Sequence, residues 1–121
     1  MTEARLALGR WGEDEAVRFL TRSGWKIVAR NLRTPVGELD IVARQGKLLA
    51  FIEVKTRRGL GFGTPQEAVG AHKRRQIVRA AQWYLAGERA LAALQPRFDV
   101  IAVLQREGTA QIEHIPDAFG I

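Results

Sequence analysis

The chain has 121 residues, and its 19 lysines and arginines against 13 acidic residues give a net charge of +6. Hydrophobic residues make up 46% of the chain and cysteine is absent, which excludes a disulfide scaffold, a thiolate zinc site and a cysteine nucleophile. We therefore expect one globular domain over residues 1–121 whose basic charge attracts a polyanion, with ordinary surface charge for solubility as the alternative. The chain has no apolar run long enough to span a bilayer and no signal-peptide pattern, so we expect a nucleic acid partner, no membrane partner and a cytoplasmic location.

The first predicted element is a helix over residues 2–23. Apolar residues recur at helical spacing there, Thr2 can cap the helix, and Gly24 can end it. Glu13 lies on the apolar stripe of this helix rather than on its polar face. A carboxylate in that place is either recruited to a functional site or paired with an arginine at the edge of the core.

The next predicted elements are a strand over residues 25–32 and a hairpin of residues 38–44 and 47–56 around Gln45-Gly46. A glycine-containing loop and a short helix with a capping box come next, before a second long helix, one or two further turns and two strands joined at Glu107-Gly108. These later segments are residues 57–63, 64–70, 72–86, 88–94, 97–104 and 111–115. The order α-β-β-β-α-β-β predicts an α/β or α+β sandwich in which helices cover one mixed sheet.

The hairpin carries the residues with chemical potential. If Gln45-Gly46 are its two loop residues, Arg44 pairs with Lys47 and Glu38 lies opposite Glu53. Because directly opposed side chains share a face, four ionisable side chains then project from one side of the sheet: Glu38, Asp40, Glu53 and Lys55. The alternative is an exposed hairpin face with an ordinary cross-strand ion pair.

Carboxylates arranged in this way repel one another, and a bound divalent cation removes the repulsion. All-oxygen ligands favour Mg²⁺ or Mn²⁺. Asp40 and Glu53 are the main candidate metal ligands, with Glu13 and Glu38 as further candidates. Lys55 is placed to orient or deprotonate an attacking water, or to stabilise charge in the transition state of phosphodiester hydrolysis.

Two known groups of proteins share these residues. Gly37-Glu38-Leu39-Asp40, twelve intervening residues and Glu53-Val54-Lys55 resemble the motif of the PD-(D/E)xK nucleases, although Pro35 is not adjacent to Asp40. A wider set of segments resembles the YraN-like bacterial family: Gly12-Glu13, Arg30-Asn31, residues 37–40, residues 51–57, Phe62-Gly63, Lys73 and residues 97–100.

The resemblance implies an α/β fold with a restriction-endonuclease-like αβββαβ core, a mixed sheet flanked by helices. It also implies catalytic roles for Asp40, Glu53 and Lys55, with Glu13 as a metal ligand carried by the first helix. The order Glu…Asp…Glu-x-Lys is similar to that of archaeal Holliday-junction resolvases. Because two strands must be cut by such enzymes, a homodimer is an expectation as well.

Basic residues flank the acidic hairpin on both sides of the glycine-containing loop. They are candidates for holding the phosphate backbone, with a solvated helix face as the alternative: Arg57, Arg58, Lys73, Arg74, Arg75 and Arg79. Phe62 in the loop could stack on a base or fold back on the core. The histidines are not spaced as metal ligands, and we expect all three tryptophans, Trp11, Trp25 and Trp83, in the core. Asp99 is expected to pair with Arg97 or a buried arginine.

The leading hypothesis is a Mg²⁺- or Mn²⁺-dependent endonuclease that hydrolyses DNA phosphodiester bonds, in the repair or recombination of branched DNA. The alternative is a non-catalytic module of the same fold that binds nucleic acid. The binding module makes its own predictions. Its binding to nucleic acid would survive the loss of Asp40, would need Lys73, Arg74 or Arg75, and would weaken as the salt concentration rises. A structural protein of the translation or envelope apparatus has only the basic charge in its favour.

Overall fold

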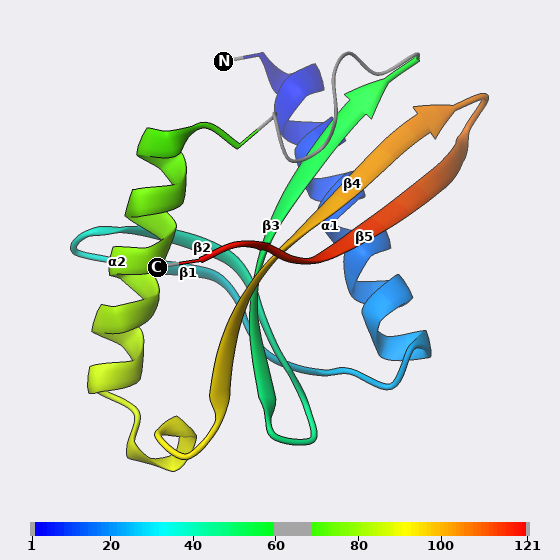
Figure 1. The fold of residues 1–121 in the computed structure, drawn as a ribbon. Helices are drawn as coiled ribbons and strands as arrows, with labels where there is room; N and C mark the ends of the chain where they lie inside the picture. Colours follow the sequence, from blue (N-terminus) through cyan, green and yellow to red (C-terminus); the bar gives the residue numbers. More distant parts are fainter. Residues whose placement is uncertain (1, 60–68, 121) are drawn as a thin grey trace.

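In residues 2–59 and 69–120, which the computed structural model describes, two helices flank a five-stranded mixed sheet (Figure 1). The sheet has the strand order β1-β2-β3-β4-β5. The predicted αβββαβ core and mixed sheet are therefore confirmed. The elements are α1 (Glu3–Arg22), β1 (Lys26–Thr34), β2 (Gly37–Gln45), β3 (Leu48–Arg58), α2 (Ala71–Ala86), the short 3₁₀ helix η1 (Arg89–Leu91), β4 (Gln95–Arg106) and β5 (Thr109–Phe119).

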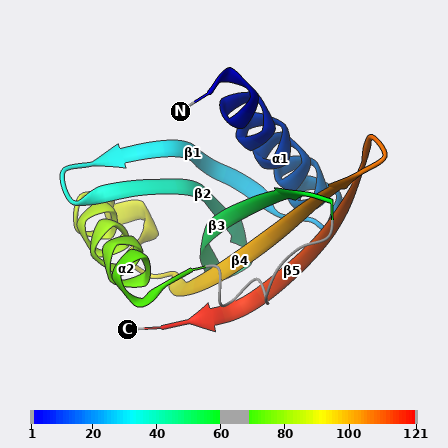
Figure 2. The same cartoon turned by 90° about the horizontal axis from the view of Figure 1, so that it is seen from above.

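The two helices lie on opposite faces of the sheet (Figure 2). β3 and β4 run parallel and are connected through α2, whereas the other neighbouring strands are antiparallel. Apolar residues on each face of the sheet make a separate core, one centred on Phe51 under α2 and the other on Leu20 of α1. This arrangement buries residues 49–53 of the central strand β3 on both faces.

The ends of the helices follow from the sequence. The hydroxyl of Thr2 accepts a hydrogen bond from the backbone N–H of Arg5 and so caps α1, which ends just before Gly24, at φ +88°. Gly87 follows α2. Neither helix in the described part of the chain combines the length and the apolar character needed to cross a membrane.

The hairpin of β2 and β3 forms, but the predicted register is wrong by two residues. Gln45 pairs with Leu48, so the loop residues are Gly46-Lys47 rather than Gln45-Gly46. Gly46 has a φ of +59° at the first loop position, where type II′ turns require glycine. Glu38 therefore does not lie opposite Glu53. A shift of two residues keeps every side chain on its predicted face, because side chains alternate with a period of two.

Other expectations are confirmed or corrected. The hairpin of β4 and β5 turns at Glu107-Gly108 as predicted, with φ values of +51° and +77°, as type I′ turns require. Arg57 and Arg58 belong to β3, which is longer than predicted, and not to the following loop. Phe62 and residues 64–68 of the predicted short helix at 64–70 lie outside the described residues, and residues 69–70 are not helical. Trp83 is not in the core, because half of its surface is exposed on α2.

Candidate functional site

The central feature of the site is a pair of carboxylates at the point where β2 and β3 separate. The ladder between these strands ends at Ile41 and Ile52. Asp40 comes next on β2 and Glu53 next on β3. The Oδ2 atom of Asp40 accepts a hydrogen bond of 2.9 Å from the backbone N–H of Val54, which replaces the missing ladder bond. This hydrogen bond ties the side chain of Asp40 on β2 to β3, where its negative charge acts on the neighbouring Glu53.

Glu53 lies in an environment that disfavours its charge. The residue is 5% exposed, and burial raises its pKa to about 8, with the neighbouring charge of Asp40 adding to the rise. Two lysines act in the opposite direction: the Nζ atoms of Lys73 on α2 and Lys55 on β3 lie 4.0 and 3.8 Å from Oε1 of Glu53. These are loose contacts, longer than a hydrogen bond. They leave the pair of acids without full neutralisation.

A third carboxylate, Glu13, reaches the pair from α1. An added Cβ at Gly12 would lie 1.9 Å from the Oγ1 atom of Thr56, so only glycine lets the helix approach β3 this closely. Burial raises the pKa of Glu13, and the charge of Asp40 raises it further. The side chain of Glu13 is 13% exposed and so lies at the rim of the site.

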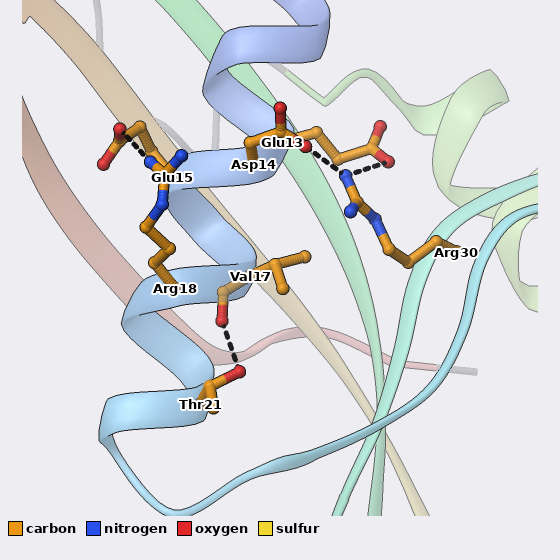
Figure 3. Close-up of polar contacts among 7 residues, drawn as sticks. All are labelled: Glu13, Asp14, Glu15, Val17, Arg18, Thr21 and Arg30. Atoms are coloured by element: carbon orange, nitrogen blue, oxygen red, sulfur yellow. Dashed lines mark hydrogen bonds and ion pairs between the residues drawn. The ribbon is translucent and has the colours of Figure 1, made fainter.

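Arg30 of β1 holds the outer side of this rim (Figure 3). Its Nη2 atom lies 2.7 Å from Oδ1 of Asp14 and 3.4 Å from Oε1 of Glu13. Glu13 therefore does both things that the sequence left open. It pairs with an arginine at the edge of the core, and it lies near Asp40. Arg30 is bound chiefly by Asp14.

Glu13, Asp40 and Lys55 line one cleft between α1 and β3. Its described walls are Arg5, Leu8, Gly9, Glu13, Asp40, Val54, Lys55 and Thr56. Arg5, Gly9 and Thr56 were not predicted as site residues. The sequence could have predicted Arg5 and Gly9. They precede Glu13 by eight and four residues, and this spacing places all three on one face of a helix. The cleft has a carboxylate floor with cations at its edges, which suits a phosphodiester held near a metal ion.

The structure brings together only some of the predicted residues. Asp40, Glu53, Lys55 and Lys73 meet, with Glu13 at the rim. Glu38 lies outside this group, because it is exposed and faces Arg33 of β1. Four of the remaining predicted basic residues are exposed, Arg57 and Arg58 at the end of β3 and Arg75 and Arg79 on α2, and Arg74 on α2 is half-buried.

A second buried carboxylate, Asp99 on β4, has a complete set of partners. Arg97 binds both of its oxygens, at 2.9 and 2.8 Å, as predicted. Nε2 of His114 lies 2.8 Å from Oδ2, and the backbone N–H of Asp117 donates to Oδ1 at 3.0 Å. Burial alone would raise the pKa of Asp99, but the hydrogen bonds from His114, Arg97 and Asp117 outweigh it and lower the pKa. This cluster is a structural ion pair.

The residues present fit a hard divalent cation in a limited way. Within residues 2–59 and 69–120, no three acidic or histidine side chains are arranged to hold a metal ion. Mg²⁺, however, often binds through one or two carboxylates and takes its other ligands from water and substrate phosphate. The adjoining carboxyl groups of Asp40 and Glu53, which lack full neutralisation by the protein, match that donor set.

Comparison with known proteins places the chain among bacterial relatives. A sequence model of the uncharacterised protein family UPF0102 matches residues 12–103. A UPF0102 protein of Syntrophotalea carbinolica is 66% identical over all of this chain and 98% of its own length. One from Moorella thermoacetica is 48% identical over 98% of this chain and all of its own.

The fold also resembles a solved structure. Hjc, a Holliday junction resolvase from the archaeal hyperthermophile Archaeoglobus fulgidus, aligns with a TM-score of 0.55 and 23% sequence identity. The alignment covers 86% of this chain and 72% of the Hjc chain. At this level of identity the likeness establishes that the two chains share a fold.

Proposed function

We propose that this chain, which belongs to the uncharacterised protein family UPF0102, is a divalent-metal-dependent endonuclease that hydrolyses DNA phosphodiester bonds. The observation that carries the proposal is the adjoining pair of carboxyl groups, Asp40 and the buried Glu53, with Lys55 two residues further along β3. A protein does not gain stability from a buried acid pair of this kind, and Asp40 opens to a cleft, so the pair supports a functional role.

Each residue has a role that its position supports. Asp40 and Glu53 would hold Mg²⁺ or Mn²⁺, and Glu13 would support them from α1. The cation, when bound, would lower the pKa of a coordinated water and offset charge on the phosphate. Lys55 would orient or deprotonate the attacking water, or stabilise charge on the phosphoryl oxygens. In the reaction, the oxygen of water bonds to phosphorus and one phosphorus–oxygen bond of the strand breaks.

The surrounding charge and the fold both support a nucleic acid substrate. Lys73 lies beside Glu53, Arg5 lines the cleft, and Arg57 and Arg58 extend β3 beyond Lys55. Cations on both sides of a metal site can hold the backbone of a nucleic acid. Hjc, which has the same fold, is a Holliday junction resolvase, and this supports branched DNA as the substrate of the present chain.

Cleavage assays test the proposal. A supercoiled plasmid and a four-way DNA junction are incubated with the protein and Mg²⁺ or Mn²⁺. We expect Asp40→Asn and Lys55→Ala each to lower the rate at least about 100-fold. Two exposed residues provide matched controls, Glu113→Gln on β5 and Lys26→Ala at the start of β1, and both should cleave at the wild-type rate. Metal-dependent cleavage that survives loss of both Asp40 and Lys55 would contradict the assignment.

One observation favours a second candidate, a non-catalytic module that binds nucleic acid. The described residues contain no arrangement of three metal-binding side chains. A non-catalytic module would bind DNA equally well with and without divalent cations. It would not produce nicked or linear plasmid under any condition. Binding would then depend on the basic residues alone and would weaken steeply with salt.

A further inference from the structure

A row of exposed residues runs along the outer face of α2. Arg75, Arg79 and Trp83 are four residues apart and therefore lie above one another on one side of the helix. All three are exposed, and Trp83 exposes 50% of its surface. We call these three residues the α2 band. The helix carries four basic residues and no acidic one, so nothing along α2 itself offsets the charge of the band.

A groove lies beside the α2 band. It is lined by Arg74, Arg75, Val78, Arg79, Gln82 and Gly120, and it runs between α2 and the C-terminal end of β5, which approaches the helix in both views (Figures 1 and 2). Arg74 forms part of the wall, because its Nε donates to the carbonyl of Val69 and its guanidinium lies 5.7 Å from the ring centre of Phe119. The groove therefore has an apolar floor at Val78 and cationic sides.

The α2 band lies on the opposite side of the helix from Lys73, which faces the carboxylate site, because residues two apart in a helix point in opposite directions. Lys73 is two residues before Arg75, and its Nζ lies 4.0 Å from Glu53. From Arg75 to Trp83 the helix rises about 12 Å. That distance corresponds to roughly three or four base steps at 3.4 Å per step. A strand that leaves the carboxylate site past Lys73 would pass around α2 to reach the band on its outer face.

The chemistry of the α2 band fits nucleic acid better than a second copy of this chain. Arginines hold phosphates while an exposed aromatic ring stacks on a base, the combination that single-strand-binding surfaces use. A symmetric contact between two copies would instead place the arginines of one α2 against those of the other. Among the described residues, the exposed large apolar side chains are Leu6 on α1 and Trp83, so Trp83 is the only one of them on the α2 band.

We propose that the α2 band binds a single-stranded segment of the DNA substrate, with Arg75 and Arg79 on its phosphates and Trp83 stacked on an unpaired base. The proposal rests on the proposed nuclease function and narrows its substrate class. DNA with a boundary between duplex and single strand offers a duplex for the cleft and an unpaired strand for the band. A continuous duplex keeps its bases stacked internally and offers Trp83 no partner.

Fluorescence anisotropy in EDTA tests the α2 band without any cleavage. Three labelled DNAs are compared: a blunt duplex, the same duplex with a single-stranded tail, and the tail alone. We expect the wild type to prefer the tailed duplex, and Trp83→Ala to weaken that binding roughly ten-fold while changing the blunt duplex less than about two-fold. Trp83→Phe should keep most of the preference. Arg75→Ala and Arg79→Ala should weaken binding of the tailed duplex and of the tail alone, and each should lower the salt slope of that binding by about one.

The controls separate this proposal from its competitors. Arg22→Ala, an exposed charge at the far end of α1, should bind all three DNAs as the wild type does. Wild-type preference for the tail in Trp83→Ala would overturn the proposal. So would a Trp83-dependent preference for a tailed RNA over the tailed DNA, or a shift from dimer to monomer in light scattering for Trp83→Ala with unchanged DNA binding.

Failure of the band and failure of the nuclease are distinguishable. Asp40→Asn removes a cleavage residue and should leave the preference for the tail intact. If the wild type cleaves DNA but Trp83→Ala binds the tail normally, the proposed role of the α2 band is wrong and the proposed nuclease function is supported. If the tail preference depends on Trp83 but no metal supports cleavage, the nuclease is wrong and the α2 band stands.

Discussion

Two buried carboxylates lie on neighbouring parallel strands, one residue apart in register. Asp99 on β4 lies beside Ile52, and Glu53 on β3 lies beside Val100. Asp99 is bound by Arg97, His114 and a backbone N–H, and its pKa is lowered. Glu53 meets another acid, with two lysines no nearer than 3.8 Å, and its pKa is raised to about 8. Similar burial thus produces a structural ion pair in one place and an electrostatically unfavourable site in the other.

The difference indicates which acid the fold needs. A paired buried acid stabilises the native state only while its partners remain, whereas an acid pair without full neutralisation lowers stability and persists where function requires it. The substitutions below test this contrast, and all stability measurements are made in EDTA so that added metal does not contribute.

The largest effect is expected at Asp99. Asp99→Asn leaves Arg97 and His114 without their carboxylate and should lower the free energy of unfolding by about 3 kcal/mol. Urea unfolding followed by circular dichroism measures this loss. A loss below about 1 kcal/mol would remove the contrast between the two carboxylates.

The next effect concerns the approach of α1 to the site. Gly12→Ala forces its new methyl group against Thr56, so we expect a loss of about 2 kcal/mol from overpacking, together with slower cleavage because Glu13 is displaced. Gly9→Ala is the matched control on the same helix. Nothing lies within 4 Å of a Cβ there, and the substitution should stabilise the protein by about 0.5 kcal/mol. Equal effects at both positions would refute the close approach of α1.

Substitution at Glu53 should have the opposite sign to that at Asp99. Glu53→Gln removes a buried acid next to Asp40 and should raise the free energy of unfolding by about 1–2 kcal/mol while abolishing cleavage. Thermal denaturation at pH 8 measures the gain, and the plasmid assay measures the loss. A destabilised Glu53→Gln protein would show that Lys55 and Lys73 already pair Glu53 effectively.

The two carboxylates also imply opposite pH trends. Asp99 has a lowered pKa, so its contribution is full above the pKa of the unfolded chain, near 3.8, and is lost as the pH falls through the folded pKa. Glu53 has a pKa raised from 4.5 to about 8, so the folded protein binds more protons and stability falls as the pH rises from 4.5 to 8. Unfolding is measured from pH 3 to 9. The loss of stability at low pH should be absent in Asp99→Asn, and the fall in stability between pH 4.5 and 8 should be absent in Glu53→Gln.

The sequence was sufficient to predict the fold and the face of the hairpin on which the acidic side chains lie. It was not sufficient to predict which residues surround each acid. The register error of two residues left Asp40, Glu53 and Lys55 on one face, because an even shift preserves the alternation of side chains. The partners His114 and Asp117 of Asp99 come from β5, beyond an irregularity in its pairing with β4, and no local pattern reveals them. The expected homodimer stays a prediction.

The exposure of Trp83 could have been predicted from its helical spacing, but the usual burial of tryptophan favoured the opposite prediction. Tryptophan is usually well buried, which favoured a place in the core. Its spacing of four residues from Arg79, and of eight from Arg75, places it on the charged face of α2. The helical period therefore predicted its position better than its hydrophobicity did.

The most direct test of the central claim is a titration of Mn²⁺ into the protein, followed by electron paramagnetic resonance of the unbound ion. The account expects one ion per chain for the wild type and for Glu113→Gln, and a loss of that site in Asp40→Asn and in Glu53→Gln. Binding that is unchanged in both Asp40→Asn and Glu53→Gln, or absent from the wild type even with DNA present, would contradict the claim that this carboxylate pair is a metal site.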